Sequence, residues 1–124
     1  MDARSFEGYC NNLLRDFFGV KFRKGSVRGV PKKWDLVSFD GKIVGDAKFF
    51  SLVRGEKLPP AKFSNIAEHV WLLEKVEADI KFLVFGNDRR VPEIWLERYG
   101  SLLERVRFFF IDHETGTVEE LYKA

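Results

Sequence analysis

The sequence predicts an α/β fold in which one mixed central β-sheet is flanked by helices. Three observations support this prediction. Residues 33–50 alternate apolar with polar or small side chains on both sides of Asp40-Gly41, a pattern typical of a two-residue β-hairpin. Residues 80–85 form a largely apolar run, as expected of a central strand covered on both faces. Between Arg4 and Phe18, apolar residues recur at helical spacing.

Length and composition indicate one compact domain over residues 1–124. The 124 residues are 45% hydrophobic and 32% charged, which excludes disordered and collagen-like chains. No apolar run approaches the roughly 18 residues of a membrane span, and the N-terminus lacks a signal-peptide pattern. We therefore expect an intracellular, cytoplasmic protein. The single Cys10 excludes an internal disulfide and a cysteine-based zinc cluster, and we expect it in the core.

The charge is unevenly distributed along the chain. The net charge is +2, but residues 1–62 carry +6 and residues 63–124 carry −4. A basic surface of this kind suits a polyanionic ligand. We expect nucleic-acid contacts from the basic residues of the first half, namely Lys21, Arg23, Lys24, Arg28, Lys32, Lys33, Arg54, Lys57 and Lys62.

The first elements are a helix and a strand. The periodicity predicts a helix over residues 4–18, with Ser5 as N-cap and Gly19 as C-cap. Glu7 would then lie in the first turn, where an acid also interacts favourably with the helix dipole. Residues 20–31 predict a strand that runs into a mobile basic loop, for which we favour phosphate contact over a merely solvated surface.

The hairpin predicts a patch of charged side chains. With Asp40-Gly41 as the loop, Asp35 faces Asp46, and Lys48 lies on the same face as Asp46. Opposed like charges destabilise a sheet. A divalent cation is the natural ion between the two acids, since Mg²⁺ binds one or two carboxylates and completes its shell with water and phosphate oxygens. A lysine beside it can orient the attacking water or stabilise the transition state.

The second half of the chain predicts alternating helices and strands. On the helix expected to start between residues 61 and 65 and to run to about residue 78, Ser64 is a candidate N-cap, and His69 is a polar flank rather than a zinc ligand. We expect Arg89 and Arg90 to be solvated. The other expected elements are a loop over 51–60, a strand over 80–85, a helix over 92–106 broken at Gly100, a strand over 107–112 and an edge strand over 117–121. The order is therefore α-β-β-β-α-β-α-β-β.

A helix with Glu7, then Asp35 on a hairpin and the triplet Asp46-Ala47-Lys48, resembles the PD-(D/E)xK nuclease superfamily, which has the restriction-endonuclease-like fold. The resemblance covers about the first two-thirds of the chain. Trp34 stands where that signature has its proline. The resemblance implies that Asp35, Asp46 and the carbonyl of Ala47 hold Mg²⁺ or Mn²⁺, that Glu7 binds metal directly or through water, and that Lys48 activates the water.

From this resemblance we expect a metal-dependent endonuclease that cuts DNA, with RNA not excluded. The small size is similar to archaeal-type Holliday junction resolvases, structure-specific nucleases of DNA repair or recombination. Such an enzyme would be a homodimer, with Trp95, Tyr99 and Phe109 as candidate interface residues. One alternative is a catalytically silent nuclease-like fold that binds nucleic acid or serves in assembly. Another is that the hairpin acids are simply exposed, with Lys48 in a surface ion pair worth about 0–1 kcal/mol.

Overall fold

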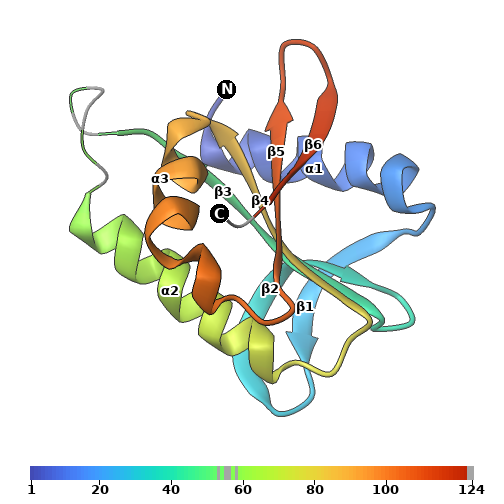
Figure 1. Ribbon diagram of the computed structural model, residues 1–124. Coiled ribbons are helices and arrows are strands. Elements are labelled where there is room, and N and C mark those ends of the chain that lie inside the picture. Colours follow the sequence, from blue (N-terminus) through green and yellow to red (C-terminus); the bar gives the residue numbers. More distant parts are fainter. Residues whose placement is uncertain (53, 55–56, 58, 123–124) are drawn as a thin grey trace.

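A computed structural model describes residues 1–52, 54, 57 and 59–122 of the chain. Within these residues the protein is α/β, with three α-helices and one six-stranded mixed sheet (Figure 1). The strands lie in the sheet in chain order. The elements are α1 (Ala3–Phe18), β1 (Phe22–Val27), β2 (Val30–Ser38), β3 (Ile43–Phe50), α2 (Pro60–Lys75), β4 (Ile80–Asn87), α3 (Arg90–Tyr99), the short 3₁₀ helix η1 (Gly100–Leu102), β5 (Arg107–Asp112) and β6 (Thr117–Leu121).

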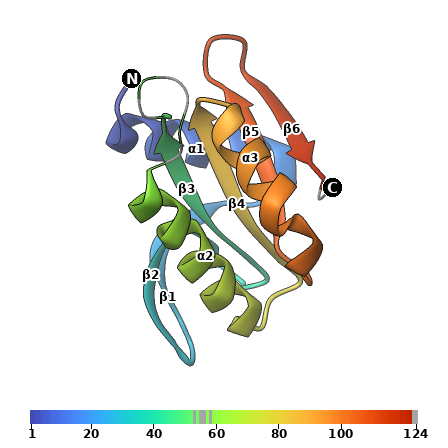
Figure 2. The same ribbon diagram turned by 60° about the vertical axis from the view of Figure 1, so that its left-hand side comes forward.

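The helices cover the two faces of the sheet separately. α1 packs on one face through Phe6, Cys10 and Leu14, while α2 and α3 cover the other face (Figures 1 and 2). β3, β4 and β5 are parallel because α2 and α3 carry the chain back between them, and the outer pairs are antiparallel. The predicted mixed sheet between helices and the buried Cys10 are confirmed. No helix among the described residues is both long and apolar enough to cross a membrane.

The start of α1 differs from the prediction. Asp2, not Ser5, is the N-cap, because its Oδ1 accepts a hydrogen bond from the Ser5 N–H at 2.8 Å. Glu7 therefore lies beyond the first turn, and the expected dipole interaction loses its basis. The predicted C-cap is confirmed, since Gly19 has φ +71° and its N–H donates to the carbonyl of Arg15.

The expected basic loop over residues 20–31 is mostly a hairpin. β1 continues to Val27, the chain turns at Arg28-Gly29 with φ +84° at Gly29, and β2 begins at Val30. The sequence pattern obscured the extent of the strand because Lys24 and Gly25 have low strand propensity. Pairing with β2 supplies the hydrogen bonds that override this preference.

A β-bulge lies in β2 beside the predicted site. Arg23 pairs with Val37 and Gly25 pairs with Trp34, so two residues of β2, Asp35 and Leu36, oppose one residue of β1. The bulge breaks the simple alternation of the strand. Trp34 and Val37 consequently both join the α2-side core, while the intervening Leu36 joins the α1-side core.

The β2–β3 hairpin has the predicted register but a longer loop. Val37 pairs with Val44 as expected. The loop is the four-residue segment 39–42 rather than Asp40-Gly41 alone: the N–H of Gly41, at φ +74°, donates to the Ser38 carbonyl. The register is preserved because the loop grows by one residue on each side, and the Ser38 hydroxyl closes it by accepting from the Ile43 N–H at 2.9 Å.

The remaining elements shift by a few residues. α2 begins at Pro60, after Pro59, so Ser64 is not its N-cap, and it ends at Lys75 rather than near residue 78. β4 extends to Asn87, and α3 begins at Arg90 and gives way to η1 instead of continuing to residue 106. The predicted β5 and β6 are confirmed. Of the loop expected over 51–60, residues 53, 55, 56 and 58 lie outside the described residues.

Candidate functional site

Asp46 and Lys48 form a close pair on β3. They follow Val44 at two-residue spacing, so they point toward α2 as Val44 does. Lys48 Nζ lies 3.1 Å from Asp46 Oδ2, and the two side chains are only 5% and 4% exposed. The alternative of an exposed surface ion pair is therefore wrong, because α2 covers this part of the sheet.

Asp35 reaches this pair across a gap between two strands. β2 pairs with β3 at Leu36–Gly45 and Val37–Val44. Next to these pairs, hydrogen bonds from backbone N–H groups to the Asp35 and Asp46 carboxylates take the place of backbone pairing. Asp46 Oδ1 accepts from the Asp35 N–H, and Asp35 Oδ2 accepts from the Ala47 N–H, both at 3.0 Å. We call this gap the notch. Because the N–H and C=O of one strand residue point to the same side, the carbonyl of Ala47 also faces it.

Glu7 joins the site from α1 through a lysine. Lys24 Nζ lies 2.8 Å from Glu7 Oε2 and 3.8 Å from Asp35 Oδ1. The residues that line the resulting pocket of about 410 Å³ come from α1, β2, β3 and α2, and they include Glu7, Asp35, Asp46, Ala47, Lys48, Lys62 and Asn65. The structure thus brings together all the residues that the sequence predicted for catalysis and metal binding.

The two aspartates have opposite electrostatic environments. Burial, together with the adjacent Asp46 and Glu7 carboxylates, raises the pKa of Asp35 to about 7. Burial would also raise the pKa of Asp46, but the contact with His69 and the Lys48 charge outweigh it and hold that pKa below its usual range. Burial lowers the pKa of Lys48, and the Asp46 charge opposes this effect. Asp46 is the firmly ionised member of the pair.

Sequence reasoning missed His69 and Asn65 at the site, and it expected Lys32 only as a nucleic-acid contact. His69 Nδ1 lies 3.3 Å and Lys32 Nζ 3.4 Å from Asp46 Oδ2. Asn65 lines the pocket, and its buried Oδ1 accepts no hydrogen bond from the described residues. A signal for two of them existed: Lys62, Asn65 and His69 recur at three- and four-residue spacing, so they share one face of α2.

The expected nucleic-acid contacts fall into two groups. Lys24, Lys32 and Lys62 lie at the site, and Lys62 Nζ is 4.5 Å from the centre of the Phe50 ring. The others are exposed and do not line the pocket: Arg23, Arg28 and Lys33 are on the β1–β2 hairpin, Lys21 precedes β1, and Arg54 and Lys57 follow β3.

Two expectations about the second half of the chain are wrong. Trp95 and Phe109 are buried, so of the three aromatic residues proposed for a dimer interface only Tyr99, at 41% exposure, is available. Their helical and strand spacing was that of core residues. Arg89 and Arg90 are not simply solvated, because Arg89 pairs with Glu119 and Arg90 pairs with Asp88. The dimer itself stays a prediction.

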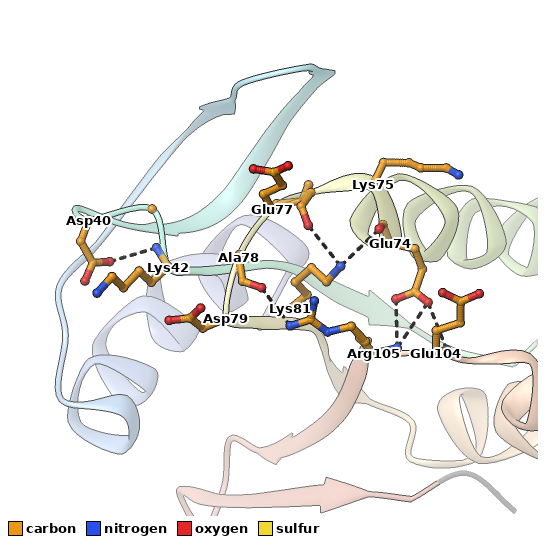
Figure 3. Close-up of a pocket in the computed structure, with 12 residues that line it drawn as sticks. Asp40, Lys42, Glu74, Lys75, Glu77, Ala78, Asp79, Lys81, Glu104 and Arg105 are labelled. Carbon is orange, nitrogen blue, oxygen red and sulfur yellow. Dashed lines mark hydrogen bonds between the residues drawn. The ribbon is translucent and has the colours of Figure 1, made fainter.

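A second polar pocket, of about 540 Å³, lies beside the 39–42 loop and the end of α2 (Figure 3). The buried Lys81 and the partly exposed Glu74 in this pocket stabilise the fold. The Glu74 carboxylate accepts from the backbone N–H groups of residues 104, 105 and 106, at 3.0–3.3 Å. Lys81 Nζ donates to the carbonyls of Glu74 and Val76 at the end of α2. We therefore interpret this pocket as a structural junction between α2, β4 and β5.

The donor set of the notch suits a hard cation in its chemistry. Asp35, Asp46, Ala47 and Asn65 offer carboxylate, carbonyl and amide oxygens, the ligands that Mg²⁺ and Mn²⁺ prefer. The Asn65 Oδ1, which has no partner among the described residues, could accept a cation, and a cation beside Asp35 would offset the burial that raises the pKa of this carboxyl. Among the residues that the structure describes, however, no group of three or more His, Cys, Asp and Glu side chains is arranged to hold a metal ion.

Comparison with family models, with curated proteins and with solved structures finds no match to this chain. Function is therefore inferred from the geometry of the notch and from the sequence motif.

Proposed function

We propose that the chain is a Mg²⁺- or Mn²⁺-dependent endonuclease of the PD-(D/E)xK type that hydrolyses phosphodiester bonds in DNA, with a restriction-endonuclease-like fold. One observation carries the proposal: the buried Asp46–Lys48 pair, 3.1 Å apart, faces Asp35 across the notch. Two acids can hold a metal ion that activates water, and an amine beside them can orient that water, so the arrangement suits metal-assisted phosphodiester hydrolysis.

Each side chain has a role in this proposal. Asp35, Asp46 and the Ala47 carbonyl would hold the metal, with Glu7 as a further ligand directly or through water. The metal would lower the pKa of its bound water and neutralise charge on the scissile phosphate. The Lys48 ammonium is placed to orient the attacking water or to donate a hydrogen bond to the phosphate. Lys24 and Lys32 would move from the carboxylates to phosphate oxygens as the metal takes over charge compensation.

The basic β1–β2 hairpin supports DNA as the substrate. Arg23, Arg28 and Lys33 are exposed along it, and β2 leads directly into Asp35. Contacts of this kind grip the backbone without reading bases. A structure-specific nuclease that acts on branched DNA, working as a dimer in the manner of a junction resolvase, is the form that we favour.

A different observation favours a second candidate, a binding module without catalysis. Asp46 Oδ2 already has three nitrogen neighbours, on Lys32, Lys48 and His69. With Glu7 and Asp35 paired to Lys24, the acids and lysines of the site balance without any metal. A site neutral by itself could serve a chain that only binds nucleic acid.

Cleavage assays separate the two candidates. Supercoiled plasmid and a synthetic four-way junction are incubated with the protein and Mg²⁺, Mn²⁺ or EDTA. Lys48→Ala is compared with Lys75→Ala, a control at the exposed end of α2, where Lys75 contacts the Trp71 ring. The endonuclease is supported if cutting requires metal, is lost in Lys48→Ala and is kept in Lys75→Ala. DNA binding without cutting under every condition supports the module instead.

A further inference from the structure

His69 is enclosed between α2 and the sheet rather than standing at a polar flank of the helix. Its side chain is only 12% exposed. On one side its ring meets Trp34 of β2 in an edge contact, with ring centroids 6.1 Å apart and planes at 71°. On the other side Nδ1 faces the pair of Asp46 and Lys48 on β3. Contacts from β2 and from β3 thus fix the orientation of the imidazole on α2.

The contacts of His69 imply a definite hydrogen-bond pattern. Nδ1 lies in hydrogen-bond contact with Lys48 Nζ and 3.3 Å from Asp46 Oδ2, while Lys48 Nζ itself lies 3.1 Å from Asp46 Oδ2. An ammonium group has three donors and no acceptor. Both contacts of the ammonium are satisfied when Lys48 donates to Asp46 Oδ2 and to His69 Nδ1, and the 3.3 Å between Nδ1 and Asp46 Oδ2 is then the spacing of two acceptors that share this ammonium. His69 then carries its proton on Nε2 and acts as an acceptor toward Lys48.

We propose that His69 is a positioning residue that fixes the Lys48 amine beside Asp46. The inference rests on the proposed nuclease function for its catalytic consequence, although the anchoring itself can be observed separately. A lysine has a flexible four-carbon stem, and holding it in one rotamer requires more than one contact. Asp46 Oδ2 alone does not fix it, because Lys32 Nζ also lies 3.4 Å from that oxygen. The second acceptor, on His69, selects one position for the amine.

Fixing the amine matters because catalytic geometry tolerates small errors only. Displacement of a catalytic group by about 1 Å can cost on the order of 100-fold in rate. Removing a residue that orients a site group typically costs about 10- to 100-fold in activity or metal affinity. We therefore expect the loss of the His69 acceptor to appear mainly in kcat, with the KM for DNA nearly unchanged.

Three variants test this inference. His69→Phe keeps the ring against Trp34 but removes the acceptor, while His69→Asn keeps an acceptor near the place of Nδ1. His113→Phe is the matched control, because His113 does not itself line the pocket, although its ring contacts Phe49, which does. We expect His69→Phe to lower kcat by about 10- to 100-fold and His69→Asn to recover most of that loss. The control should cut at the wild-type rate.

The inference is overturned if His69→Phe keeps the wild-type kcat. It is also overturned if the two His69 variants lose activity equally and in proportion to a fall in Tm, since a purely structural role predicts that result.

A second measurement does not depend on nuclease activity. In NMR spectra of the metal-free protein, the two Hε protons of an immobilised Lys48 should give separate signals. They should merge in His69→Phe and separate again in His69→Asn. Unchanged Lys48 signals in His69→Phe would refute the anchoring. If the wild-type protein cuts no DNA, yet its Lys48 signals are separate and merge in His69→Phe, the proposed function fails while the anchoring of Lys48 by His69 stands.

Discussion

Without metal, the protein should lose stability as the pH rises from 5 to 8, and Asp35→Asn should abolish that loss. The folded state raises the pKa of Asp35 from its ordinary 3.8 to about 7. Between these values the folded protein keeps a proton that the unfolded chain has released. Because the unfolded state then binds fewer protons, the free energy of unfolding falls with rising pH. The loss is complete above about pH 7, where Asp35 is ionised in both states.

The size of the effect follows from the change in pKa. One pKa unit corresponds to about 1.36 kcal/mol, so ionised Asp35 costs the fold at most about 4 kcal/mol above pH 7. Between pH 5 and 8 the wild type should lose roughly 2–3 kcal/mol of this. The side chain is only 14% exposed, so solvent screens the effect weakly. An asparagine can still accept the Ala47 N–H bond while removing the charge.

Urea unfolding in EDTA at pH 5, 6, 7 and 8 measures the prediction. Asp35→Asn should be more stable than wild type at pH 8 and show a flatter pH profile. Asp46→Asn is the contrasting variant. In the wild type the folded state lowers the pKa of the Asp46 carboxyl. The stabilisation by ionised Asp46 is therefore present from pH 5 to 8 and disappears only as the pH falls below about 4. Asp46→Asn should be less stable than wild type by about 3–5 kcal/mol, because it leaves Lys48 buried without its partner.

The reasoning is refuted if wild type gains stability from pH 5 to 8, or if Asp35→Asn is the less stable protein at pH 8. Added Mn²⁺ provides a further check. A cation bound between the acids should raise the stability of the wild type at pH 8, and the same Mn²⁺ should raise that of Asp35→Asn much less.

Two other predictions concern the DNA surface and the core. Replacing Lys32 and Lys33 together by Ala should weaken DNA binding and flatten its salt dependence in fluorescence-anisotropy titrations; an unchanged salt slope would place these residues outside the interface. Gly45→Ala should destabilise the protein by about 1–3 kcal/mol in thermal unfolding, because an added Cβ would lie about 2.4 Å from the Phe82 ring. Full stability of Gly45→Ala would show that this ring moves freely.

Local patterns in the sequence predict much of the fold. Alternation around Asp40-Gly41 gave the Val37–Val44 pair even though the turn is longer than expected, because apolar residues on both strands admit one register only. The apolar run after residue 80 predicted β4 and the helical spacing of apolar residues predicted α1, because the spacing of apolar side chains indicates the type of element. Element ends were less predictable, since Asp2 and Ser5 are both good N-caps and the choice depends on where the chain enters the helix.

The sequence by itself determined that β2 pairs with β3 and which face of β3 carries Asp46 and Lys48, because strand periodicity is a local property of the backbone. Only the tertiary structure decided what surrounds them. The bulge that turns Asp35 into the notch depends on pairing with β1, and the approach of His69 depends on how α2 crosses the sheet. Contacts between residues far apart in the chain leave no periodic signal in either segment, so they appear only when the layers pack together.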